Sequence, residues 1–141
     1  MKIQAKTEYA CKAILELSLH WPDNQPLSIT SIARRQKIPL KFLTQILLHL
    51  KQLGMAESIR GKNGGYILKK APQEITLYDV LGSLAELNFQ QKDSKKYHAI
   101  DIFQEIWIQI DEVIIKRLQS ITFDDLARKQ KFLNQMPTYT I

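Results

Sequence analysis

Residues 28–70 read SITSIARRQKIPLKFLTQILLHLKQLGMAESIRGKNGGYILKK, a stretch that begins with helical spacing and ends with strand spacing. Ser28 is a good helix N-cap, Pro39 suits the first position of a second helix, and Gly54 is typical just past a helix end. We therefore expect helices over residues 28–36 and 39–53. Two helices joined by so short a turn predict a helix-turn-helix.

The second half of this stretch predicts a β-hairpin. Residues 55–60 and 66–70 have the pattern of two short strands, and the GKNGG segment between them is a glycine-rich turn with one cation. The turn lacks the Gly-Lys-Ser/Thr ending of a nucleotide-binding loop and joins two strands, which argues against phosphate binding of that kind. A helix-turn-helix followed by a basic-tipped hairpin predicts a winged helix.

The flanking sequence is mainly helical. Apolar spacing predicts helices over residues 7–20, 76–86, 99–119 and 122–133. Thr76 and Thr122 are expected N-caps, with Asp79 and Asp125 three residues later, where an acid favours the helix dipole. The predicted fold is therefore mainly α with a small hairpin wing. Its expected parts are a winged helix-turn-helix over 1–84, a polar sensor-region loop over 85–98, and a dimerisation helix with a C-terminal helix over 99–134.

The helix expected over residues 99–119 is apolar on two sides. Its main stripe follows helical spacing, whereas Ile108 and Ile115 fall on a different side. A helix with two apolar faces is normally covered on both, and a chain of 141 residues has little other mass to do so. We therefore expect a second subunit to cover it, through an interface of Phe103, Trp107, Ile108, Ile110, Ile114 and Ile115.

Positive charge is concentrated in the first half of the chain. Residues 1–70 contain twelve Lys or Arg against four Asp or Glu, a net charge of +8, while residues 71–141 carry −2. A phosphate backbone is the commonest partner of such a block, because neutralising phosphates releases counterions. The alternative is a basic surface that serves solubility.

Other protein classes find little support in the sequence. No apolar leader follows Met1, and no run approaches the length of a membrane span, so we expect a cytoplasmic protein. No nucleophile–base arrangement or metal-ligand spacing stands out, which argues against an enzyme and against a metal site. The single cysteine, Cys11, is expected to be a buried, inert thiol; redox sensing or ligation between subunits is the alternative.

The chain resembles the Rrf-two family of bacterial winged-helix transcription regulators. This family includes an iron–sulfur-cluster regulator, a nitric-oxide-sensing repressor and a cysteine-metabolism repressor. The resemblance rests on MKI at residues 1–3, IARRQ at 32–36, FLTQIL at 42–47, SIRGKNGGYIL at 58–68 and EITLYDV at 74–80. It implies a dimer with crossed long helices that binds double-stranded DNA at a palindromic operator. It also implies that helix 39–53 enters the major groove and the hairpin enters the minor groove.

Several residues of the second helix of the motif are expected to contact DNA. Gln45 can donate to and accept from adenine in one plane. Phe42 is expected either to contact a thymine methyl or to lie at the core edge, and Lys41 to contact a phosphate. Thr44 occupies a position that is acidic in some relatives, so operator preference is expected to differ here.

The hairpin and the surrounding helices supply further candidates. In the family the arginine that matches Arg60 enters the minor groove, where a narrow A·T-rich groove deepens the negative potential. Lys62 is a candidate phosphate contact, and Lys6, Ser31 and Arg34 are weaker candidates of the same kind.

The cofactor of many relatives is not expected here. Those relatives hold an iron–sulfur cluster with three cysteines that lie before the long helix, and residues 85–98 contain none. The sequence therefore favours a dimeric repressor that responds to a small molecule or a partner protein. The alternatives are a protein-interaction module that acts through a metabolic enzyme or another regulator, and a non-specific architectural DNA-binding protein.

Overall fold

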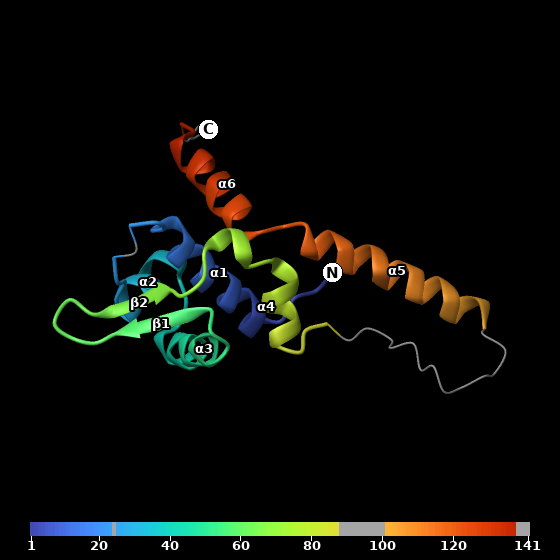
Figure 1. Cartoon of the computed structure of the whole chain (residues 1–141), viewed down its shortest axis with the longest axis horizontal. Coiled ribbons are helices and arrows are strands. Elements are labelled where there is room, and N and C mark those ends of the chain that lie inside the picture. Colours follow the sequence, from blue (N-terminus) through green and yellow to red (C-terminus); the bar gives the residue numbers. More distant parts are fainter. Residues whose placement is uncertain (24, 88–100, 138–141) are drawn as a thin grey trace.

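The computed structural model describes residues 1–23, 25–87 and 101–137. A helical head contains α1 (Ala5–Leu19), α2 (Ile29–Gln36), α3 (Leu40–Gln52), the hairpin β1 (Ala56–Ile59) and β2 (Gly65–Leu68), the 3₁₀ turn η1 (Pro72–Glu74) and α4 (Leu77–Ser83) (Figure 1). Two helices follow, α5 (Ile102–Gln119) and α6 (Phe123–Gln135). The mainly helical fold with a small hairpin wing is as predicted.

Three of the predicted helix starts are confirmed by their side-chain caps. The Ser28 hydroxyl accepts a hydrogen bond from the Ser31 amide at 3.1 Å. At α4 and α6, Thr76 and Thr122 form complete capping boxes with the acids three residues later. Each box satisfies two amides that a helix end leaves without a partner.

Several helix boundaries differ from the sequence prediction by one to three residues, and two of these differences share one reason. α1 begins at Ala5, before Thr7, and α4 ends at Ser83, before Glu86. Ala85 takes a left-handed conformation with φ of 54° and turns the chain back toward the start of α1. The Glu86 carboxylate then accepts hydrogen bonds from the Gln4 amide at 2.9 Å and the Thr7 hydroxyl at 2.6 Å. A carboxylate remote in sequence therefore caps α1.

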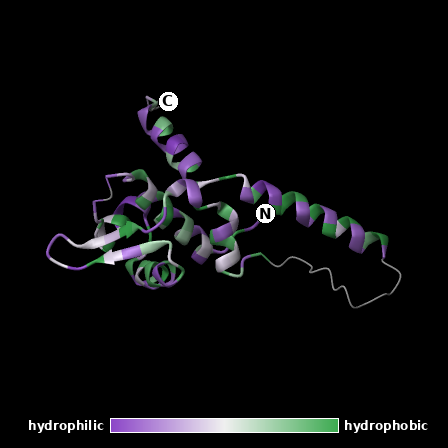
Figure 2. Cartoon of the chain, in the orientation of Figure 1, coloured by the Kyte–Doolittle hydropathy of each residue, from purple (hydrophilic) through white to green (hydrophobic). Residues whose placement is uncertain are grey.

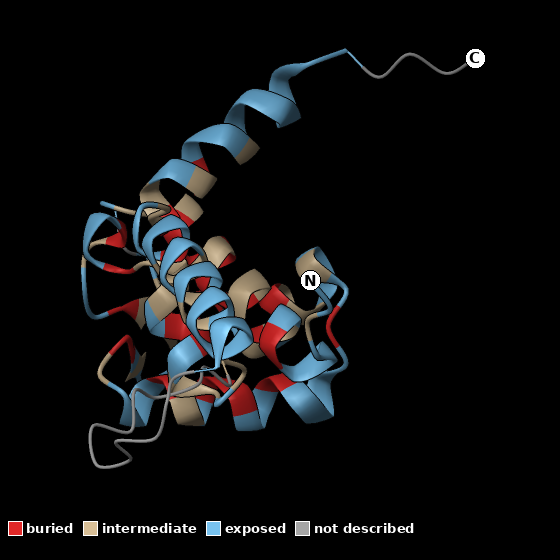
Figure 3. Ribbon diagram, turned by 90° about the vertical axis from the view of Figure 1, so that its right-hand side faces the viewer, coloured by how far each residue is buried: buried red, intermediate tan, exposed pale blue. Residues whose placement is uncertain are grey.

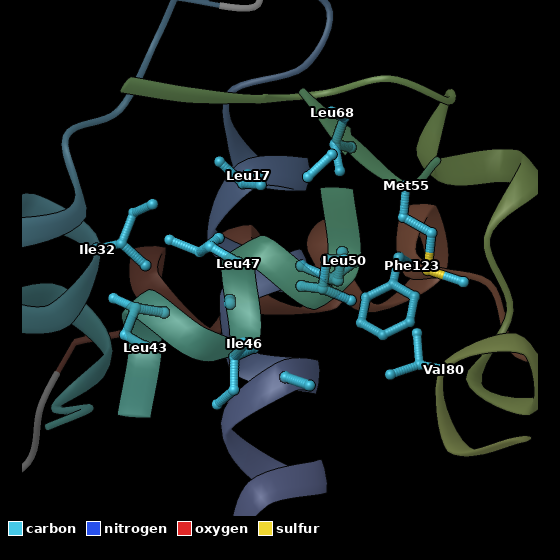
Figure 4. Close-up of a cluster of buried hydrophobic side chains, with 14 of the residues drawn as sticks. Leu17, Ile32, Leu43, Ile46, Leu47, Leu50, Met55, Leu68, Val80 and Phe123 are labelled. Carbon is cyan, nitrogen blue, oxygen red and sulfur yellow. The ribbon is translucent and has the colours of Figure 1, made fainter. Parts of the chain in front are cut away.

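The core of the head is built around α3. Leu43, Ile46, Leu47 and Leu50 are buried on one face of this helix, as predicted from their spacing. Figure 4 shows these side chains within a cluster that also contains Phe123 of α6. Because α3 is fixed on its apolar face by neighbouring helices, its opposite face has a defined orientation in the head.

The hairpin is attached to the head by a third extended segment. β1 and β2 pair antiparallel, from Ala56 opposite Leu68 to Ile59 opposite Gly65. Tyr66 also exchanges backbone hydrogen bonds with Leu27, at 3.0 and 2.8 Å. A Cβ at Gly65 would overlap the Leu27 carbonyl group and lie 2.9 Å from the Ser28 nitrogen. Glycine is required here because the two backbones approach so closely.

α5 extends away from the head, whereas the chain rejoins the head at the start of α6, whose far end projects from it (Figure 1). Among the residues of α5 only Leu118 is buried, and Figure 3 shows most of this helix as exposed. The corner between α5 and α6 is tied to the head by hydrogen bonds from Leu77 N to Ile121 O at 3.0 Å and from Phe123 N to Ile75 O at 2.8 Å. Among the described residues, no helix is both long and apolar enough to span a membrane.

Candidate nucleic-acid interface

The turn between α2 and α3 sets the angle between the two helices. Lys37 adopts the left-handed conformation at φ of 54°, and the Ile38 amide donates to the Ala33 carbonyl at 2.9 Å. This is the hydrogen bonding of a left-handed helix end, with lysine in the position that glycine usually takes. Ile38 is buried in the hydrophobic core of the head and anchors the turn. α3 is thereby presented as the second helix of a helix-turn-helix.

Four residues of α3 form its outward face, defined here as Lys41, Thr44, Gln45 and Leu48. They follow the spacing of one helical face, and all four are exposed. Lys41, Thr44 and Gln45 were predicted DNA contacts, and the structure brings them together. Leu48 was not predicted, because apolar periodicity does not distinguish a leucine that faces solvent from its buried neighbours. The one signal in the sequence was its spacing of four residues from Thr44.

Phe42 lies beside this face, toward α1. Its ring stacks on Tyr9, with ring centroids 6.2 Å apart and an interplanar angle of 24°. Together with Lys6 these aromatic residues line a groove of about 570 Å³ between α1 and α3, which also includes Gln45. Phe42 is half exposed, so it is a core-edge aromatic whose other side faces solvent. The structure therefore places Lys6, Phe42 and Gln45 at one groove.

The wing presents two cations without intramolecular ion pairs. Arg60 and Lys62 lie at the hairpin tip, both exposed, and neither forms a salt bridge within the described part of the chain. Strand β1 of the wing is joined to α3, because Lys51 Nζ donates to Ser58 Oγ at 2.8 Å. This hydrogen bond and the pairing with Leu27 fix the hairpin relative to α3.

The structure separates the two adjacent arginines of α2. Arg35 Nη1 donates to Glu16 Oε1 at 3.2 Å and lies 2.9 Å from His20 Nε2. Glu16 is buried, so this arginine compensates a buried carboxylate. Arg34 is exposed and makes no ion pair among the described residues, which leaves it available for a phosphate. Ser31 is half-buried, and its amide is occupied by the Ser28 cap.

The predicted interface residues of α5 are all at least partly exposed. Phe103 and Trp107 stack on each other with ring centroids 6.5 Å apart, and they are 62% and 49% exposed. Ile110 is also exposed, whereas Ile108, Ile114 and Ile115 are half-buried. Figure 2 shows apolar bands along the length of this helix. An isolated chain thus leaves a long apolar surface in contact with water.

Cys11 is a poor metal ligand in this setting. Burial, followed by the negative charges of Glu8 and Glu86, raises the pKa of its thiol to about 11. Metals bind the thiolate, and the chain contains no other cysteine. The described residues also contain no cluster of three His, Cys, Asp or Glu side chains able to hold a metal. The donors present therefore do not fit a thiolate-held iron–sulfur cluster.

A helix-turn-helix whose second helix has an exposed outward face, followed by a cationic hairpin, defines a winged-helix DNA-binding protein. Comparison with known proteins agrees. Residues 3–129 match the Rrf2 family, described as an iron-dependent transcriptional regulator. The chain belongs to the Rrf2 family and is a DNA-binding transcription regulator, not an enzyme. The iron dependence in the family description is not matched by the single cysteine of the chain or by any donor cluster among the described residues.

Individual relatives cover nearly the whole chain. A Synechocystis protein, slr0846, assigned by its name to the HTH-type transcriptional regulators, is 38% identical over 129 residues, which are 89% of this chain and 87% of that protein. The solved structure of T. potens IscR has a TM-score of 0.79 and 29% identity, and the match covers 99% of this chain and 94% of the other. CymR, the global cysteine regulator of B. subtilis, also has a TM-score of 0.79 and 29% identity, with 92% and 98% covered.

Proposed function

We propose that this chain is a homodimeric repressor that binds a palindromic operator under the control of a small-molecule or protein effector. The observation that carries the dimer is the exposure of α5. This helix has 18 residues, of which only Leu118 is buried. Exposed apolar surface of this extent costs free energy in water, at about 25 cal/mol per Å². Pairing with the same helix of a second copy removes much of this surface from water.

A two-fold dimer explains the expected form of the operator. Two identical heads related by a two-fold axis contact two half-sites of the same sequence in opposite orientation. The operator is then a palindrome, with its half-sites separated by about one helical turn of DNA or a multiple of it. Dimer formation and operator symmetry are thus two consequences of one interface.

The proposed contacts follow the groove that each element enters. The outward face of α3 lies in the major groove, with Gln45 on an adenine and Lys41 on a phosphate. Arg60 at the wing enters the minor groove, which attracts arginine where it is narrow. Phe42 contacts the DNA at the margin of α3. The remaining residues proposed to contact phosphates, which position the protein without reading sequence, are Lys6, Ser31, Arg34 and Lys62.

The proposed effector is a small molecule or a partner protein, and not a metal cluster held by several cysteines of each chain. This is supported by the single cysteine and by the raised pKa of its thiol. The groove between α1 and α3 contains Phe42 and Gln45, so a molecule seated there would contact the proposed reading helix directly. A partner protein is the other class of effector consistent with this donor set.

The DNA-binding proposal is tested with sheared genomic DNA from the source organism. Purified protein is incubated with the fragments at near-physiological salt, and retained DNA is sequenced. We expect a few promoter fragments that share a two-fold-symmetric site. Weak uniform retention that disappears as salt rises would mean that only the electrostatic contribution is present, as for architectural binding. Strong capture of an enzyme without any retained DNA would favour an interaction module.

The dimer is tested separately by sedimentation of a charged variant. Trp107→Glu places a carboxylate within the exposed apolar stripe of α5, and we expect it to sediment as a monomer where the natural chain is a dimer. Burial of an unpaired charge in an interface is strongly unfavourable. Gln109→Glu is the matched control, because this exposed residue lies on the same helix away from the stripe. Monomeric behaviour of the natural chain at micromolar concentration would contradict the proposal.

A further inference from the structure

We propose that this regulator recognises thymine methyl groups through Thr44 and Leu48 on the outward face of α3, so that its half-site is read mainly at A·T pairs. The inference rests on the proposed function and specifies the bases that the site takes. It begins from an unusual feature of the outward face. Two of its four side chains, in the middle of a head of high positive charge, have little or nothing to offer as hydrogen-bond donors.

The hydroxyl of Thr44 is already engaged. Thr44 Oγ1 donates its single proton to the Leu40 carbonyl oxygen at 3.0 Å, within its own helix. With that proton used, the side chain has no donor left for guanine or for the O4 atom of thymine. Thr44 is exposed, so its methyl group remains available for contact. Among the base edges of the major groove, the C5-methyl of thymine is the apolar group.

Leu48 continues the same face one turn later. Its side chain is 52% exposed, although leucines on neighbouring positions of α3 are fully buried. A leucine has no hydrogen-bonding group, so it can distinguish bases only by apolar contact. Phe42, 49% exposed beside this face, adds a third apolar side chain. An apolar group set among cations is explained if it meets an apolar group on the DNA.

The other side chains of the face are consistent with A·T recognition. Gln45 carries the donor and acceptor that pair with adenine in one plane. α3, which is described in full, contains no Asp or Glu, so no carboxylate on this helix accepts from the amino group of cytosine. The Lys51 side chain of the last turn is held by Ser58 of β1. The chemistry of the face therefore favours adenine through Gln45 and its partner thymine through the methyl group.

The test replaces thymine by deoxyuridine, one position at a time, in the operator found by genomic selection. This change removes only the major-groove methyl. We expect a loss of about fourfold in affinity for each methyl that contacts α3, since one buried methylene-sized group contributes that much. Thymines that face the wing provide an internal control, because a minor-groove contact does not involve the methyl. Uniform insensitivity to all replacements would overturn the proposal.

A pair of variants at Thr44 separates the methyl from the hydroxyl. Thr44→Val keeps a methyl of the same size and removes the hydroxyl, whereas Thr44→Ser does the reverse. We expect Thr44→Val to bind the operator within about twofold of the natural chain and Thr44→Ser to lose about fourfold. The opposite order would show that the hydroxyl oxygen reads the base, and the inference would be wrong.

Combining a protein variant with a substituted operator shows which thymine methyl contacts Leu48. In Leu48→Ala, the penalty of deoxyuridine at the thymine that contacts Leu48 should disappear, while the penalties at other positions persist. Full retention of every penalty in this variant would remove Leu48 from the site. Failure of the inference differs from failure of the proposed function: in the first case the natural chain still selects a specific operator, and in the second it selects none.

Discussion

Gly65→Ala is predicted to displace the hairpin from its contact with Leu27 in the head. The Cβ introduced by this change would overlap the Leu27 carbonyl group, and both partners in the contact are backbone. No side-chain rotation relieves such an overlap, so one of the two segments has to move. This movement would break the two backbone hydrogen bonds between Leu27 and Tyr66, which measure 3.0 and 2.8 Å.

The expected loss follows from these two hydrogen bonds. Each intramolecular hydrogen bond contributes about 1 kcal/mol net, so opening the pair costs about 2 kcal/mol of unfolding free energy. Gly82→Ala is the matched control, since the same substitution in α4 meets nothing within 4 Å. Alanine in a helix is favoured over glycine by up to about 1 kcal/mol. One chemical change is therefore predicted to have opposite signs at two positions.

Urea denaturation followed by circular dichroism measures both variants. Relative to the natural chain, we expect Gly65→Ala to lower the midpoint and Gly82→Ala to raise it or leave it unchanged, with similar slopes. The operator affinity of Gly65→Ala should also fall, because the displaced hairpin carries Arg60. Equal midpoints for Gly65→Ala and the natural chain would refute the claim that the backbone approach at Leu27 requires glycine.

Four further predictions concern charged and nucleophilic side chains. Arg60→Ala should weaken operator binding by about 1–3 kcal/mol without changing the melting temperature. Arg35→Ala should lower the melting temperature, because the buried Glu16 carboxylate then loses its arginine partner and keeps only Gln36 and His20; an unchanged melting temperature would exclude that role. The hydrogen bonds from Thr7 and the Gln4 amide hold the pKa of Glu86 below its usual value. The ionised Glu86 carboxylate therefore stabilises the folded chain above its unfolded pKa, near 4.5, and this stabilisation is lost as the pH falls through its folded pKa. In urea titrations at several pH values, Glu86→Ala should not show this loss of stability at low pH. Because burial raises the pKa of Cys11 to about 11, its reaction with a thiol reagent at pH 8 should be much slower in the folded chain than in urea; equal rates would contradict this.

The local structure of this protein follows closely from the sequence. Ser28, Thr76 and Thr122 are predicted caps and are caps in the structure, because capping depends on residues at most three positions away. The buried stripe of α3 also follows its spacing, since a helix fixes which residues share a face. The winged helix-turn-helix was readable for the same reason: its turns are set by short-range chemistry at proline and glycine.

The environment of individual site residues did not follow from the sequence. Arg34 and Arg35 are adjacent and identical in type, yet the fold gives only Arg35 a buried carboxylate as partner. Leu48 is one of several leucines in α3, and the sequence does not show that it is exposed, because its exposure depends on which elements pack against this helix. Such differences are decided by groups far apart in the chain, which no local pattern contains.

The sequence by itself determined the fold class, the three helix starts capped by Ser28, Thr76 and Thr122, the basic head and the two-sided apolar character of α5, because each depends on spacing or on summed charge. Only the tertiary structure decided that Glu86 caps α1, that Leu27 fixes the wing, and that the face of α3 with Thr44, Gln45 and Leu48 is left exposed. The physical reason is the range of the interactions. Capping boxes and apolar stripes act within a few residues, whereas these contacts require a completed core to bring distant segments together.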